Sequence, residues 1–158
     1  MRTETINIYT FDELSDAAKE KAREWYKNGM EYFWWNESLE SIKAFCDGYG
    51  VTVKDYSIGP FECSWITTDA ENANFRGVKL RDVPRDDIPT GYCLDCTLWQ
   101  TFHDEFKRTG DALRAFNEAI DAAVAQIVAD MEYQYTDESV DENILINEYE
   151  FLENGERA

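Results

Sequence analysis

Hydrophobic residues recur every three or four positions in three stretches of the chain, the spacing that places them on one face of a helix. The first stretch predicts a helix over 15–28 that ends at Gly29, and the second predicts a helix over 31–47. Beyond Gly110, the longest stretch predicts a helix over 111–135. Because only a short segment separates the first two helices, we expect them to form a hairpin.

Alternation of hydrophobic and polar residues, which is typical of strands, replaces the helical spacing in the middle of the chain. It predicts four strands, near 51–53, 61–65, 72–79 and 92–100. The segment 81–91 contains two prolines and dense charge, follows neither period, and is expected to be an exposed loop.

The two ends of the chain carry shorter signals. Near the start, a brief strand pattern precedes Thr10 and Glu13, whose spacing fits a capping box. Near the close, the pattern predicts a short helix over 136–144 and a last short strand at 148–152. The elements together predict one α+β domain over 1–158, with an antiparallel meander sheet, an N-terminal helix hairpin and a long C-terminal helix packed on one face.

Composition fits a globular protein, because 44% of the 158 residues are hydrophobic. The net charge of −18 argues against direct binding to nucleic acids or anionic membranes, both of which repel an acidic surface. No apolar run approaches the length of a membrane span, and the first residues lack the pattern of a signal peptide. We therefore expect a cytoplasmic protein.

Acidic residues accumulate toward the C-terminus, where residues 130–156 contain ten of them and no Lys or Arg. Like charges four residues apart on a helix cost a few tenths of a kcal/mol per pair, so stability alone would not select the pattern. We interpret the run as an imitation of the DNA backbone that occupies a basic groove on a protein partner. The candidate partner-binding residues are Asp130, Glu132, Asp137, Glu138, Asp141, Glu142, Glu148, Glu150 and Glu153.

Two other interpretations of the acidic run remain open. A solvated face that keeps the protein soluble is the common role of such runs. A divalent-cation site is less favoured, because the chain has no Asp-rich loop of the calcium-binding type.

Candidate catalytic chemistry is sparse. Cys63, Cys93, Cys96 and His103 allow a zinc site to be written down, but Cys93 and Cys96 would point to opposite faces of the predicted strand. The four cysteines are instead interpreted as buried or half-buried thiols. No nucleophile elbow, phosphate-binding loop or metalloprotease motif occurs, so we expect no catalytic residues, no metal and no cofactor.

Large aromatic residues cluster around the predicted helix hairpin, and most are expected to pack in its core. Of the consecutive residues Phe33, Trp34 and Trp35, at least one must be partly exposed, because three neighbours on a helix cannot all face inward. An exposed aromatic side chain could anchor a partner.

Two stretches, Tyr9–Tyr26 and Asp137–Phe151, resemble a family of small acidic proteins encoded by phages, prophages and plasmids and loosely labelled antitoxin-like. The resemblance implies a mobile-element setting, in which such proteins often inhibit restriction enzymes or CRISPR effectors. It therefore favours a non-enzymatic, DNA-mimicking inhibitor of a host defence complex. The alternative is an antitoxin-like or regulatory module that binds a partner through its aromatic hairpin.

Overall fold

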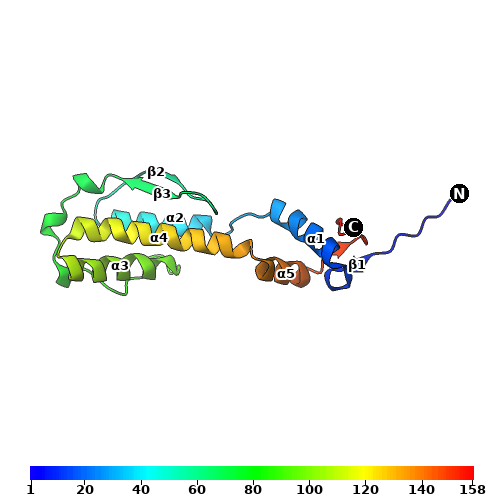
Figure 1. Cartoon of the computed structure of the whole chain (residues 1–158). Helices are drawn as coiled ribbons and strands as arrows, with labels where there is room; N and C mark the ends of the chain where they lie inside the picture. Colours follow the sequence, from blue (N-terminus) through cyan, green and yellow to red (C-terminus); the bar gives the residue numbers. More distant parts are fainter. The chain divides into compact units, whose positions relative to one another are not determined.

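Five α-helices and two small antiparallel sheets make up the chain, so the fold class is α+β, with a long helix in the C-terminal part as predicted (Figure 1). The computed structural model describes all residues from 1 to 158. Contacts between residues divide them into two compact units, unit 1 with residues 1–31 and 132–158, and unit 2 with residues 32–131. The expectation of a single domain over 1–158 stays a prediction.

Unit 1 consists of two packed helices, α1 (Asp16–Asn28) and α5 (Asp137–Ile146), and a small sheet of β1 (Tyr9–Thr10) and β4 (Glu150–Phe151). Both helices begin where a hydroxyl accepts a backbone hydrogen bond, as N-caps do: Ser15 accepts from Ala18 and Thr136 from Ser139. The predicted capping box of Thr10 and Glu13 is confirmed. The core of unit 1 is small and comprises Phe11, Leu14, Ala18, Ala22, Val140, Ile144 and Phe151.

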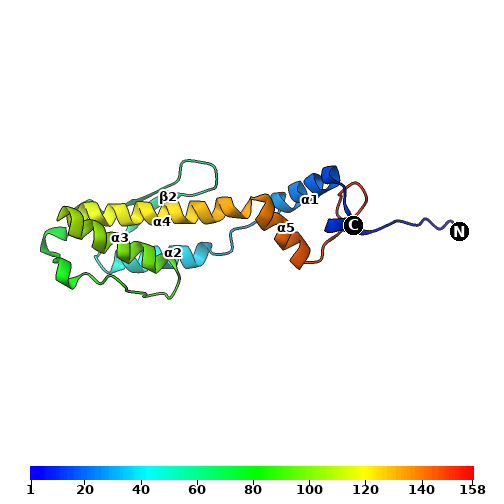
Figure 2. The same ribbon diagram turned by 60° about the horizontal axis from the view of Figure 1, so that its bottom comes forward.

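Unit 2 contains α2 (Trp35–Asp47), α3 (Leu94–Thr109) and most of α4 (Ala112–Gln134), which lie side by side in both views (Figures 1 and 2). A hairpin of β2 (Val53–Ser57) and β3 (Trp65–Thr68) is joined to α3 by a long segment with three single 3-10 turns, at 70–72, 75–77 and 80–82.

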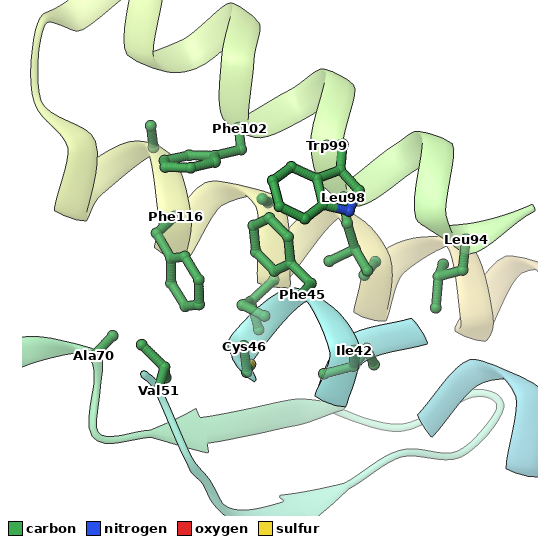
Figure 3. Packing of buried hydrophobic residues seen from close by; sticks show 14 of the residues in the cluster. Ile42, Phe45, Cys46, Val51, Ala70, Leu94, Leu98, Trp99, Phe102 and Phe116 are labelled. Carbon is green, nitrogen blue, oxygen red and sulfur yellow. The ribbon is translucent and has the colours of Figure 1, made fainter. Parts of the chain in front are cut away.

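Aromatic rings from all three helices meet at the centre of unit 2. Phe45 extends from α2 toward Trp99 and Phe102 of α3 and Phe116 of α4 (Figure 3). Its ring stacks on Phe116 with centroids 4.8 Å apart and meets the edge of Trp99 at 5.0 Å. Such pairs add to the stabilisation from buried area, so this cluster is the main core of unit 2.

The predicted strand at 92–100 is wrong, because this segment begins helix α3. The segment has buried residues at every fourth position, Leu94, Leu98 and Phe102. This spacing fits one face of a helix, but residues an even number of positions apart also share one face of a strand. The buried carboxylate of Asp95 accepts hydrogen bonds from the backbone N–H groups of Thr90 and Gly91, which orders the preceding loop and helps to start the helix.

The predicted strand at 72–79 is also wrong, since most of that segment forms short turns around Asn72, Asn74 and Gly77, residue types that favour turns. Without these two strands no meander forms. The sheets are separate pairs with orders β1–β4 and β2–β3.

The predicted helix hairpin is wrong as well, although both helices exist. α1 packs against α5 in unit 1, whereas α2 packs against α3 in unit 2. A short connection favours adjacent helices, but here each helix buries its apolar face on a partner distant in sequence.

The interpretation of all four cysteines as buried or half-buried thiols is correct only in part. Cys46 is buried in the core of unit 2, where burial raises the pKa of its thiol to about 12. Cys96 is half-buried, whereas Cys63 and Cys93 are exposed. Both are exposed because neither lies in a strand: Cys63 lies in the loop between β2 and β3, and Cys93 lies at the start of α3.

Candidate functional site

The candidate acidic residues are distributed over both units. Asp130 lies on α4 in unit 2, where partial burial raises the pKa of its carboxyl group. Glu132 is half-buried on the last turn of α4, in unit 1. The others lie on α5, in the segment that follows it through β4, or, for Glu153, in the turn after β4.

Helix α1 neutralises part of this acidic array. Arg23 donates two hydrogen bonds to Asp141, from Nε to Oδ1 at 2.6 Å and from Nη2 to Oδ2 at 2.7 Å. This pairing raises the pKa of the Arg23 guanidinium, and both side chains are mostly buried, with 17% and 28% of their surfaces exposed. Asp137 lies 3.6 Å from Lys27 Nζ. Asp137 and Asp141 therefore help to hold α5 against α1.

Lys21 forms a similar bridge to the C-terminal segment, with Nζ 2.8 Å from Glu156 Oε1. After these pairs are set aside, five of the eight candidate carboxylates of unit 1 remain exposed with no cation within 4 Å. We call them the open acidic surface: Glu138, Glu142, Glu148, Glu150 and Glu153. This surface is smaller than the predicted site and lies on one short stretch of chain.

Glu148 adopts an unusual backbone conformation within the open acidic surface. Its φ of 52° lies in the left-handed region, where glycine is favoured at the end of a helix. Its N–H donates to the carbonyl of Leu145, and that of Tyr149 donates to Ile144, so the residue terminates α5. A non-glycine residue in this conformation costs about 1–2 kcal/mol.

The aromatic residues do not form the single core predicted for a hairpin. Trp25 is 37% exposed and packs on Tyr149 and Phe151 of unit 1. In unit 2, Trp35 is half-buried, whereas Phe33 and Trp34 are 78% and 53% exposed. The prediction that at least one of the three consecutive aromatics is exposed is therefore confirmed.

The structure does not assemble the candidate zinc ligands. No group of three or more His, Cys, Asp or Glu side chains is placed to hold a metal ion, so Cys63, Cys93, Cys96 and His103 do not converge. His103 instead lies beside Asp104, whose pKa is lowered by hydrogen bonds from Arg85 and His103.

No helix is both long and apolar enough to cross a membrane.

A hollow of about 270 Å³ lies between β3 and α4 of unit 2. Its polar lining includes Glu71, Asn117 and Asp121, and burial together with the nearby Glu118 raises the pKa of Asp121. The lining has no histidine, cysteine or lysine, and its titratable groups are the carboxylates of Glu71 and Asp121.

Replacement of Asp141 by Asn should separate its structural role from that of its neighbour Glu142. We expect Asp141→Asn to lower the free energy of unfolding by about 2 kcal/mol, because Arg23 loses a charged partner in a mostly buried setting. The matched variant Glu142→Gln should change it by less than about 0.5 kcal/mol. Urea denaturation followed by circular dichroism measures the free energy of unfolding of both variants. Equal losses would contradict the distinction between Asp141, which is paired with Arg23, and Glu142, which is open.

In comparisons with known proteins, no family model, curated protein or solved structure matches the chain.

The sequence patterns did not predict that α1 pairs with α5, although a signal for it exists. Arg23 and Lys27 are four residues apart, as are Asp137 and Asp141, so two helices with complementary charges were available to pair. The contact of Trp25 with Tyr149 has no such local signal.

Proposed function

We propose that this protein is a non-enzymatic inhibitor whose open acidic surface binds a basic, nucleic-acid-binding groove of a protein partner in place of DNA. The partner class is a host DNA-targeting defence complex, such as a restriction enzyme or a CRISPR effector, which is the setting that the resemblance implies. The observation that carries the proposal is the set of five exposed, unpaired carboxylates within residues 138–153.

Charge distribution supports this proposal. Unit 1 contains 16 acidic and 6 basic residues, and three of those bases already pair with Asp137, Asp141 and Glu156. The five carboxylates of the open acidic surface lie on α5, in β4 and in the short segments on either side of β4. A fixed array of one sign accelerates association with an oppositely charged groove and orients it.

The backbone at Glu148 gives independent support. Glycine would relieve the strain of its left-handed conformation, yet a carboxylate occupies the position. Strain retained at an exposed residue is typical of functional positions. We therefore assign Glu148 to the binding surface together with Glu138, Glu142, Glu150 and Glu153.

A second candidate function is an antitoxin-like or regulatory module that binds through unit 2. Phe33 and Trp34 favour it, because both are largely exposed and Trp34 stacks on Tyr92 at 6.2 Å. Exposed aromatic side chains are common anchors of protein interfaces. The two functions use different surfaces and are separated by mutation.

The test uses a quadruple variant, Glu138→Gln, Glu142→Gln, Glu148→Gln and Glu150→Gln. Tagged parent protein captures partners from host lysate at low salt, and the captured nucleic-acid-binding protein is then purified for affinity measurements. We expect the variant to bind about 30–100-fold more weakly while its melting temperature stays within about 3 °C of the parent value. A DNA duplex should compete with the parent, and rising salt should weaken binding.

A matched control removes four exposed charges from unit 2: Glu40→Gln, Glu62→Gln, Asp86→Asn and Glu118→Gln. It should bind within about three-fold of the parent, because net charge alone is not the determinant. Equal weakening by both variants, or absence of DNA competition, would refute the mimicry. Loss of binding only in Phe33→Ser with Trp34→Ser would establish the second function instead.

A further inference from the structure

The last residues of the chain place a cation against two perpendicular aromatic rings in unit 1. The guanidinium carbon of Arg157 lies 5.9 Å from the centroid of the Trp25 ring and 5.2 Å from that of Tyr149. The two rings are themselves 5.2 Å apart with an interplanar angle of 83°. Rings at this angle present two π-faces to one cation, which is the arrangement of aromatic cages that bind alkylammonium and guanidinium groups.

Buried structure beneath the rings keeps them in place without Arg157. Phe151 is fully buried and meets the edge of Trp25 with centroids 5.8 Å apart. Tyr26 lies beside both rings, 6.4 Å from each. The two rings, on α1 and on the segment after α5, therefore pack against the edge of the core of unit 1.

The side chain of Arg157 is held by main-chain oxygens and by the two rings, and its main chain pairs with Phe151 in a β-bridge. It is exposed, no Asp or Glu side chain lies within 4 Å of its guanidinium, and its hydrogen bonds go to the main-chain oxygens of Glu150 and Ala158. Glu148 and Glu150, on either side of Tyr149, are exposed and have no cation partner. A cation from outside would thus meet both an aromatic face and a negative surrounding potential.

We propose that Trp25 and Tyr149 form a binding site for an arginine side chain of the partner, and that Arg157 occupies this site in the free protein. The guanidinium of Arg157 identifies the ligand chemistry, since it is the group that the rings already accept. A partner arginine must displace Arg157, so the C-terminal segment competes with the partner. The identity of the partner rests on the proposed function, whereas the cation site does not.

The site is tested without any partner by vacating it. N-acetyl-arginine amide is added to Arg157→Gln at constant ionic strength, and it should shift the indole N–H resonance of Trp25 saturably. We expect a dissociation constant of tens of millimolar. This constant should be about five-fold or more lower than the one measured for the parent protein. The parent and the matched variant Arg114→Gln, which removes an exposed arginine of unit 2, should respond weakly. Neutral N-acetyl-glutamine amide should produce no shift in any of them.

A second variant removes one wall of the site. Arg157→Gln combined with Tyr149→Leu should lose the response of Trp25 to the probe. Equal shifts in the parent and Arg157→Gln, or a full response without the Tyr149 ring, would overturn the inference and leave Arg157 as a structural contact only. Because these readouts use the free protein, they stand whether or not the acidic quadruple variant loses its partner.

Discussion

Replacement of Phe45 by Ala is expected to lower the free energy of unfolding by about 3–5 kcal/mol, the usual cost of truncating a buried aromatic residue. Phe45 has no exposed surface and contacts rings from both other helices of unit 2, so its removal leaves a cavity that none of them can fill without moving. The measurement is urea denaturation. The control is Phe33→Ala, where the ring is 78% exposed and the loss should stay below about 1 kcal/mol.

The same variant tests the prediction of one domain over 1–158. If the units unfold together, hydrogen exchange in α1 and α5 should accelerate along with exchange in α2 and α3. Faster exchange confined to unit 2 would show that the chain contains two domains. A loss of stability below about 1 kcal/mol for Phe45→Ala would contradict the central position of its ring.

Helix positions could be predicted closely wherever local chemistry marks both ends. Residues 15–28 and 111–135 were expected to be helical, and α1 spans Asp16–Asn28 while α4 spans Ala112–Gln134. The hydrophobic stripe placed the second helix after Gly110, and in the structure Gly110 ends α3 with a left-handed φ of 70°. These signals act within a few residues, so they do not depend on the tertiary structure.

Assembly of the elements could not be predicted, because it depends on contacts between distant residues. Spacings of four residues in 92–102 fit a strand as well as a helix, and packing against α2 and α4, together with the Asp95 hydrogen bonds, selects the helix. The connection between α1 and α2 is short, yet each packs in a different unit. The local pattern therefore identified most helices, whereas two of the predicted strands, 72–79 and 92–100, and the meander order were wrong.

The sequence predicted where acidic residues accumulate along the chain, but not which of them form an exposed, unpaired surface. Counting charges located the run from 130 to 156, but not the division between Asp141, held by Arg23, and Glu142, which is open. That division depends on which face of α5 is turned to α1. The aromatic site of Trp25 and Tyr149 joins residues 124 positions apart, a contact that no spacing in the sequence encodes.

Gly155 should be the most sensitive glycine in unit 1, because its Cα lies directly against the backbone of α1. A methyl group at this position would overlap the carbonyl oxygen of Ala18 and lie 2.9 Å from its carbonyl carbon. The φ of Gly155 is also 86°, which side chains rarely adopt. We expect Gly155→Ala to lower the free energy of unfolding by about 2–5 kcal/mol, as the sum of backbone strain and forced separation.

Gly110→Ala is the matched control, since Gly110 has a similar φ of 70° but nothing within 4 Å of an added methyl group. Gly110→Ala should lower the free energy of unfolding only by the cost of the left-handed backbone conformation, about 1–2 kcal/mol. A larger loss for Gly155→Ala measures the close contact between the C-terminal turn and α1, and equal losses would contradict it. Because this turn also carries Arg157 to the aromatic rings, its displacement should shift the indole N–H resonance of Trp25, whereas Gly110→Ala should leave that resonance unchanged.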